Sequence, residues 1–355
     1  MQHGNQQLGK HTLAEIRSQA DSWDAVFMRI DKDGENFKVI FNRAEEILFA
    51  GCGSAFNISH AVAPFFQLLS GKTCRAVHSS DLLIFPDEFI SRRRKTLVIV
   101  YSRSGDTTES VMALEKAKHS GAFVLSVVCF SKSRMAGEAH VALVLEEAVE
   151  KSVTTTRSLT SMVLAGYYLA GVCTGNDSAC EELKKLPDIA REKMASFEET
   201  GKKIGRDRGI NKYAFVGSGS YYGLAREAQL KVKEMVLLPS DSYVSLDYQH
   251  GPMSNVDPSM LVTVMVSDAG WSYDLTLARN MKNLGGKVFV LCDRGDQEFH
   301  RYADYIVELN SGLGDGIRNI LYMPAIQFMA YYRSLLEGQD PDNPKNLDYY
   351  IDLNR

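Results

Sequence analysis

The sequence lacks an excess of charge and a long apolar segment, and each absence excludes a class of protein. Its 40 basic and 44 acidic residues give a net charge of −4, which leaves no basic surface for nucleic acid. No stretch approaches the ~20 apolar residues that cross a bilayer, and the N-terminus lacks the basic and apolar parts of a secretion signal. We therefore predict a cytoplasmic protein that binds neither nucleic acid nor a membrane.

Metal and nucleotide motifs are also missing. The six cysteines form no C-x-x-C pair and no histidine stands at zinc-ligand spacing from them, so we expect free thiols and no metal site. No Walker pattern is present. Gly51 and Gly53, with Asp81 further on, are the beginning of a dinucleotide-binding fingerprint, but Phe56 stands where the third glycine is needed. This alternative is therefore disfavoured.

The chain contains two similar halves. "ILFAGCGSAFN" matches "YAFVGSGSYYG" in the second half, so that Gly51 falls on Gly217. "LVIVYSRSGDT" then matches "LVTVMVSDAGW", which places Ser102 on Ser267, and "SGAFVLSV" matches "GGKVFVLC" with the same spacing. Three blocks in the same order predict a duplicated domain.

Short apolar runs alternate with segments long enough for a helix in both halves. The runs are 46–50, 74–78, 96–101, 122–128 and 141–145, then 213–217, 261–266, 287–292 and 304–308. This alternation indicates βαβ units and a parallel sheet, and the absence of polar residues within the runs is typical of strands covered on both faces. Each half should be a three-layer α/β sandwich, flanked by helical segments at 9–34 and about 155–205.

Three hydroxyl-rich loops follow predicted strands or open predicted helices. In "VYSRSGDTTES", Ser102, Ser104 and Thr107 come at the carboxyl end of a strand, where ligand crevices of parallel sheets lie. The other two loops are "GCGSAF", with Ser54, and "EKSVTTTRSLTS" at 150–161. Each hydroxyl alone could be a helix N-cap, but three converging loops favour a phosphate site.

One predicted helix, 224–238, carries a ridge of charge beside its apolar stripe. Glu227, Lys231 and Glu234 form this ridge. Arg226 and Lys233 lie roughly opposite the apolar stripe and should be ordinary solvent charges. The ridge could be a surface ladder worth a few tenths of a kcal/mol. A glutamate held beside a lysine in a cleft could instead abstract a proton next to a carbonyl.

One of the eight histidines stands out. His250 lies in "YQHGPM", where Gly-Pro fixes a turn, and imidazole supplies both an acid and a base near pH 7. A single histidine is more often structural, so His250 gains weight only beside the charged helix that precedes it.

Together, "GCGSAF", "YSRSGDTTES", "EKSVTTTRS", "REAQLKVKE" and "YQHGPM" resemble the sugar isomerase (SIS) domain family in its tandem arrangement. The AgaS-like group of tagatose-6-phosphate isomerases and galactosamine-6-phosphate deaminases is most similar. The resemblance implies two SIS domains, at 41–195 and 196–340, each an αβα sandwich with a five-stranded, flavodoxin-like parallel sheet. A helical segment (1–40) precedes them and a tail (341–355) follows.

The resemblance also assigns roles to residues. It implies Glu234 as the catalytic base, supported by Lys231 and Glu227, and His250 as the ring-opening group, which the neighbouring subunit of a homodimer contributes. The implied binding residues for a sugar phosphate are Gly53, Ser54, Ser102, Arg103, Ser104, Thr107, Val153, Thr155 and Tyr349. No metal or organic cofactor is implied.

Two departures from the relatives narrow the expected chemistry. No amidotransferase domain precedes the repeat and no cysteine follows Met1, so glutamine is not expected to be the nitrogen source. In "DNPKNLDYY", Tyr349 takes the place of the Schiff-base lysine of the related synthase. Isomerisation or deamination of a hexose 6-phosphate is then the expected activity; the alternatives are a fructosamine-6-phosphate deglycase and a non-catalytic sugar-phosphate sensor.

Overall fold

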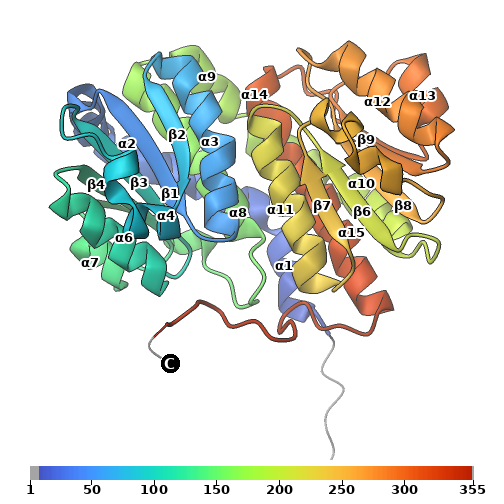
Figure 1. Cartoon of the computed structure of the whole chain (residues 1–355), viewed down its shortest axis with the longest axis horizontal. Coiled ribbons are helices and arrows are strands. Elements are labelled where there is room, and N and C mark those ends of the chain that lie inside the picture. The colour runs from blue at the N-terminus through green and yellow to red at the C-terminus, as the bar shows by residue number, and fades with distance from the viewer. Residues whose placement is uncertain (1–7, 354–355) are drawn as a thin grey trace, which may run out of the picture.

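A computed structural model describes residues 8–353, which form two five-stranded parallel sheets side by side (Figure 1). The first sheet has the order β2-β1-β3-β4-β5, with β1 Glu46–Gly51, β2 Thr73–His78, β3 Thr96–Ser102, β4 Phe123–Val128 and β5 Val141–Val144. The second has the order β7-β6-β8-β9-β10, with β6 Lys212–Val216, β7 Ser240–Tyr243, β8 Met260–Met265, β9 Lys287–Cys292 and β10 Tyr305–Glu308. One topology therefore occurs in both halves, and the predicted pair of flavodoxin-like sheets is confirmed.

Strand β7 is the one strand that no apolar run predicted. Its sequence, "SDSY", is polar because the strand is short and lies at the edge of its sheet, where it pairs only with β6. Edge strands are commonly short and polar, since exposed apolar edges invite aggregation. Its counterpart β2 is an edge strand of the first sheet and is likewise only partly buried.

Both faces of each sheet are covered by helices. In β1, Ile47 and Phe49 point into the large core beneath α3 (Ser54–Ser70) and α8 (Arg157–Thr174), whereas Leu48 and Ala50 point into a smaller core on the opposite face. The helices over that opposite face are α4 Ser79–Ile84, α5 Pro86–Phe89, α6 Thr108–His119 and α7 Arg134–Glu138. In the second half, α12 (Trp271–Asn283) and α13 (Gln297–Tyr302) cover the corresponding face.

The two halves meet along α3 and α11 (Ser220–Met235), which run side by side at the centre of Figure 1. Gly223 allows this approach, because a Cβ atom there would lie 2.3 Å from the backbone nitrogen of Ala61. The large core runs through both halves. The helix that carries the charged ridge is therefore pressed against the first half.

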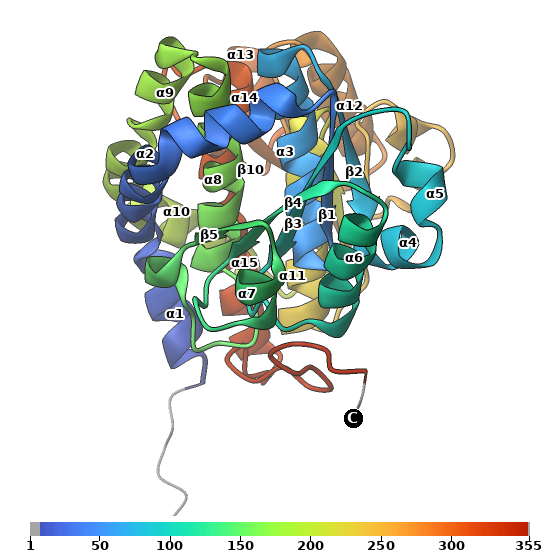
Figure 2. The same ribbon diagram turned by 90° about the vertical axis from the view of Figure 1, so that its left-hand side faces the viewer.

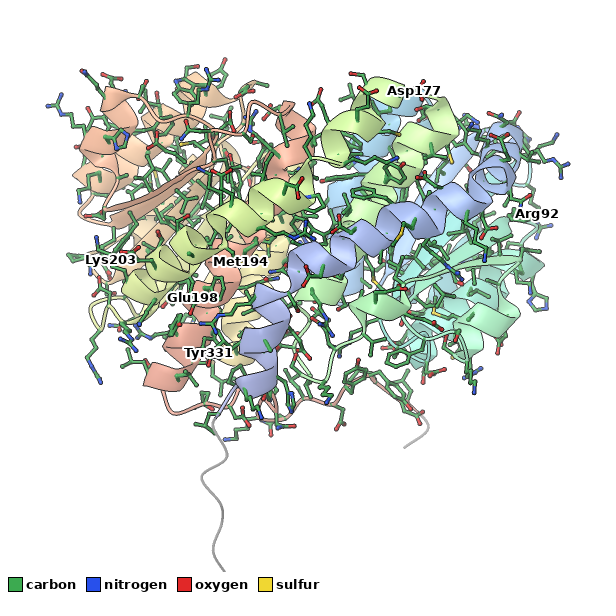
Figure 3. The ribbon with its side chains drawn as sticks, turned by 180° about the vertical axis from the view of Figure 1, so that it is seen from behind. Arg92, Asp177, Met194, Glu198, Lys203 and Tyr331 are labelled. Atoms are coloured by element: carbon green, nitrogen blue, oxygen red, sulfur yellow. The ribbon has the colours of Figure 1, made fainter. Side chains whose placement is uncertain are left out.

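Long helices cross the back of the molecule (Figure 3). These are α1 Lys10–Arg17, α2 Gln19–Arg43, α10 Leu186–Gly205 and α15 Met323–Leu336, with the short α9 Asp177–Leu183 before α10 and α14 Asp315–Arg318 before α15. Glu198 of α10 pairs with Arg17 of α1 at 2.5 Å. The predicted helical stretches are confirmed, and Pro187 lies in the first turn of α10, where proline is tolerated. Seven residues of segment 1–40 and two of tail 341–355 lie outside the described residues.

The chain after α15 crosses beneath the molecule to the carboxyl edge of the first sheet (Figures 1 and 2). Asp342 fastens its beginning, because its carboxylate accepts bonds of 2.7 and 2.6 Å from the N–H and hydroxyl of Thr12. The N–H of Val153 donates to the Asp342 carbonyl, and that of Thr108 to the Ile351 carbonyl. None of the helices within 8–353 is long and apolar enough to cross a membrane.

Candidate active site

A cavity of about 210 Å³ lies at the carboxyl edge of the first sheet. The loops after β1 and β3, the loop before α8, the C-terminal segment and the end of α11 enclose it. Ten of the predicted site residues line it: Gly53, Ser54, Ser102, Arg103, Ser104, Thr107, Val153, Thr155, Glu234 and Tyr349. Residues that lie far apart in the sequence are thus brought together by the fold, because the carboxyl ends of parallel strands share one edge.

The loop after β3 gathers three hydroxyls. Ser102 Oγ accepts the N–H of Gly105 at 3.0 Å, and Ser104 Oγ accepts the N–H of Asp106 at 3.1 Å. Thr107 Oγ1 lies 3.3 Å from Ser102 Oγ and 3.5 Å from Ser104 Oγ. Thr107 stands at the N-cap position of α6, yet its side chain makes no capping hydrogen bond. The simple N-cap interpretation is therefore wrong for Thr107, and its hydroxyl faces the other two.

The loop after β1 joins the hydroxyls to the charged helix. Gly53 has φ 54° and ψ −125°, a conformation that a side chain would strain, and α3 begins directly after it. Ser54 Oγ donates to Glu227 Oε1 at 3.0 Å and accepts from Thr155 Oγ1, also at 3.0 Å. These bonds connect the loop before α8 with α11 through one serine.

The charged ridge of α11 is buried, so the surface-ladder interpretation is wrong. The side chains of Lys231 and Glu227 are 0% and 1% exposed. Lys231 Nζ lies 3.2 Å from Glu227 Oε1 and 2.7 Å from Glu234 Oε2. It also donates to the carbonyl of Thr155 at 3.1 Å. Burial lowers the pKa of Lys231, but the two carboxylates outweigh it and the net pKa is raised. Burial raises the pKa of Glu227 despite the nearby lysine. Lys231 is therefore a permanent cation inside the protein.

Glu234 is the member of the ridge that reaches the cavity. Its side chain is 21% exposed, whereas Lys231 behind it is not exposed at all. Lys231 binds Oε2, and no described residue donates a hydrogen bond to Oε1. A carboxylate fixed through one oxygen and free at the other is able to accept a proton from a substrate.

Arg103 binds protein groups and does not present a free guanidinium to a phosphate. It donates to the carbonyls of Ser152, Val153 and Tyr349 at 3.1, 2.8 and 2.9 Å. Its guanidinium also stacks on the Tyr349 ring, 3.8 Å from the ring centre, and pairs with Glu150 at 3.5 Å. Arg103 thus lines the cavity as predicted, but its contacts join the loop after β3 and the loop before α8 to the C-terminal segment.

Tyr349 closes the cavity from the C-terminal side. Its hydroxyl donates to the carbonyl of Glu150 at 3.0 Å, and burial raises its pKa to about 12, so it stays protonated. Leu347, Asp348, Tyr350 and Ile351 line the cavity beside it. The C-terminal segment is therefore one wall of the site.

Tyr349→Ala is expected to loosen this wall. If the cavity binds the sugar phosphate that the sequence predicts, we expect KM to rise about tenfold, corresponding to ~1.4 kcal/mol of lost binding, and trypsin to cleave faster after the exposed Lys345. Steady-state kinetics and timed proteolysis measure both effects. Leu353→Ala, at a side chain that is 60% exposed, is the control. Unchanged KM and cleavage would show that the Arg103 stack does not hold the segment.

His250 does not reach the cavity within its own chain. It is exposed at the end of the 3₁₀ turn Asp247–Gln249 in the second half, ahead of Gly251 (φ 120°) and Pro252. No residue of this turn lines the cavity. If His250 acts on a substrate, it does so in a neighbouring subunit.

The sequence analysis missed one residue near the ridge, Asn57, and misjudged another, Arg226. Asn57 lies one helical turn after Ser54 on α3, and its Nδ2 donates to Glu227 Oε2 at 2.9 Å. Arg226 donates to Asn57 Oδ1 at 3.2 Å and lies 5.2 Å from the ring centre of Phe56, so the prediction that it is an ordinary solvent charge is wrong. The period of the helix placed Arg226 opposite the apolar stripe, but Phe56 and Asn57 of α3 contact it there.

Buried carboxylates shape the loop before α8. Glu150 accepts the N–H and hydroxyl of Thr156 at 2.7 and 2.6 Å, and also the hydroxyl of Ser158. Glu15 of α1 accepts the N–H of Lys151 at 2.6 Å and the hydroxyl of Ser152. These five donors around two glutamates hold the loop that presents Val153 and Thr155. No local sequence signal marks Glu15.

The SIS domain model matches residues 40–171 and 208–333, so this chain belongs to the SIS domain family. It is 26% identical over 334 residues to the glutamine–fructose-6-phosphate aminotransferase of Methanothermobacter thermautotrophicus, covering 94% of this chain and 54% of that protein. The Haemophilus influenzae enzyme of the same name is also 26% identical, over 90% of this chain and 53% of its own length. The chain thus spans about half the length of these relatives.

Two solved structures share the fold. Tagatose-6-phosphate ketose/aldose isomerase from Escherichia coli superposes with a TM-score of 0.87 at 24% identity, over 94% of this chain and 95% of that one. Glucosamine-6-phosphate deaminase from Thermotoga maritima gives 0.76 at 23% identity, over 96% and 99%. At these sequence identities the similarity establishes the fold alone, over both halves of the chain.

Proposed function

We propose that the protein is a phosphosugar isomerase or deaminase that moves a proton between C1 and C2 of an (amino)hexose 6-phosphate. The observation that carries this proposal is Glu234, which lines the hydroxyl-lined cavity and whose Oε2 is held by the buried Lys231. A binding protein has no need of a carboxylate fixed in this way beside its ligand. Phosphosugars also fit the names of the relatives, which cite fructose, tagatose and glucosamine 6-phosphates.

In this proposal one end of the cavity binds the phosphate and the other carries out the proton transfer. The hydroxyls of Ser102, Ser104 and Thr107 donate to the phosphate, which anchors the sugar at a distance from the reacting carbons. Glu234 then removes the proton from C2 of the open-chain aldose and returns it to C1 through an enediol, which gives the ketose. Lys231 holds the Glu234 carboxylate in place through the ion pair with Oε2.

If C2 carries nitrogen, the same proton transfer leads to loss of ammonia. Moving the C2 proton to C1 converts the amino aldose into an imine at C2, and water then adds to the carbon–nitrogen bond. Ammonia leaves, and the 2-ketose 6-phosphate remains. Covalent capture by a lysine is not part of the proposal, because Tyr349 lines the cavity and none of its described lining residues is a lysine.

The test is product analysis with the purified full chain on galactosamine 6-phosphate, glucosamine 6-phosphate and tagatose 6-phosphate. Ammonia with a ketose 6-phosphate supports deamination, and aldose–ketose exchange without ammonia supports isomerisation. No reaction with any of the three, together with turnover of a fructosamine 6-phosphate, would show that the protein is a deglycase. Binding without turnover of any of them would point to a sensor.

We further propose that His250 acts in the cavity of a second copy of the chain. Equal mixing of two inactive variants, Glu234→Gln and His250→Ala, tests this, because random heterodimers place one intact Glu234 opposite one intact His250. Activity should return to about a quarter of the wild-type value after co-refolding. No recovery in a mixture that forms heterodimers would contradict sharing, and residual full activity of His250→Ala alone would remove its role.

A further inference from the structure

A second cavity, of about 520 Å³, lies at the carboxyl edge of the second sheet. The loops after β6 and β8 form its floor, and the C-terminal half of α3 forms one wall. These loops repeat the backbone of the first cavity: Gly219 has φ 60° and ψ −130°, against 54° and −125° for Gly53. Ser267 Oγ accepts the N–H of Gly270 at 3.0 Å, as Ser102 Oγ accepts that of Gly105.

The catalytic residues are not repeated there. In the alignment of the two halves that places Gly51 on Gly217, the counterparts of Glu227, Lys231 and Glu234 are Ala61, Phe65 and Leu68. Phe65 and Leu68 line the second cavity from α3, as Glu234 lines the first from α11. An apolar wall therefore stands where the first cavity has a base, and the second cavity has no group for proton transfer at this place.

The phosphate-binding chemistry has also been replaced. In the alignment that places Ser102 on Ser267, Asp268 and Ala269 stand where the first half has Arg103 and Ser104. Arg318 beneath them is only 2% exposed, and it is neutralised by Asp268 at 2.6 Å and Asp315 at 3.1 Å. The polar wall thus presents carboxylates, and an anion would be repelled.

Asp274 carries the argument for a ligand. It lines the cavity and is 2% exposed, yet its Oδ2 accepts only one long bond, 3.3 Å from the N–H of Ser267. No described residue donates to Oδ1 or forms an ion pair with it. Ser245, also 2% exposed and lining the cavity, lies beside this carboxyl group, near enough to oppose the rise that burial causes in the pKa of Asp274, but its hydroxyl lies outside the geometry of a full hydrogen bond. Burying a carboxylate and a hydroxyl with too few hydrogen-bond partners destabilises the fold, and a ligand that supplied those partners would recover the lost free energy.

We propose that this cavity is a second, non-catalytic site for a small hydroxylated primary amine, such as an unphosphorylated amino sugar. The ammonium group pairs with Asp274, and a ligand hydroxyl bonds to Ser245. The apolar face of the ligand packs on Leu68, which is 77% exposed, and on Tyr273, which is 57% exposed at the cavity mouth. This inference does not depend on the reaction proposed for the first cavity.

The test is calorimetric titration of the full chain with galactosamine, with galactose as the uncharged comparison. Saturable binding of galactosamine but not galactose is expected, at least tenfold weaker in Asp274→Asn and absent in Leu68→Trp, which fills the mouth at an exposed position. The double variant Ser102→Ala/Ser104→Ala in the first cavity should bind galactosamine as the wild type does.

Three outcomes would overturn the proposal. The first is no saturable binding to the wild type, and the second is loss of binding in Ser102→Ala/Ser104→Ala, which would place galactosamine in the first cavity. The third is lower thermal stability of Asp274→Asn with unchanged binding, which would make Asp274 only a first-turn acid of α12. Near-UV circular dichroism of Leu68→Trp checks that the variant is folded. Loss of galactosamine binding in the folded variant then supports the proposal, and retained binding contradicts it.

Discussion

Glu234→Gln is expected to lower kcat about 10³-fold while phosphosugar binding stays within about threefold of the wild type. The amide keeps the shape of the side chain and still accepts a bond from Lys231 Nζ, which lies 2.7 Å from Oε2 in the native chain. It cannot, however, take up the proton that leaves C2. The phosphate end of the cavity, formed by the loop after β3, is untouched.

Two measurements separate catalysis from binding: steady-state turnover of the best substrate, and titration with its non-reacting phosphosugar analogue. Glu199→Gln, at an exposed glutamate of α10, is the matched control and should behave as the wild type. Equal losses of binding and turnover would mean that Glu234 is a contact for the sugar and not its base. Wild-type turnover retained in the variant would remove Glu234 from the mechanism.

Lys231→Met is expected to destabilise the fold by about 3–5 kcal/mol, because it leaves buried carboxylates without their cation. Methionine fits the volume of the lysine stem, so the loss comes from charge and not from a cavity. Glu227 carries most of the effect, since its side chain is 1% exposed and its remaining partners, Ser54 and Asn57, are neutral. Protonation of Glu227 limits the loss, as its pKa is already raised by burial.

Urea unfolding followed by circular dichroism measures this effect, and the core that runs through both halves favours a single transition. Adding Glu227→Gln to Lys231→Met should recover stability, because the uncompensated charge is then gone. Lys233→Met, at a lysine that is 47% exposed, is the control and should change little. If Lys231→Met were as stable as this control, the cation would not be what holds the ridge together.

Much of the architecture follows from the sequence alone. Nine strands were predicted, since apolar runs flanked by helical segments have few other stable arrangements than a covered parallel sheet. The hydroxyl loops were placed at one sheet edge for the same reason, and ten of the predicted residues line one cavity there. These features depend on local pattern and on the direction of parallel strands, which a sequence reports well.

Other features were decided by tertiary packing. The spacing of Glu227, Lys231 and Glu234 shows a ridge on a helix, but whether that ridge meets water or protein depends on Gly223, which lets α3 approach and bury it. The same contact gives Arg226 a hydrogen-bond partner on α3, and the stacking of Arg103 on Tyr349 joins positions 246 residues apart. A sequence lists the charges of a chain, whereas their partners and their burial, which set their chemistry, exist only once distant segments pack.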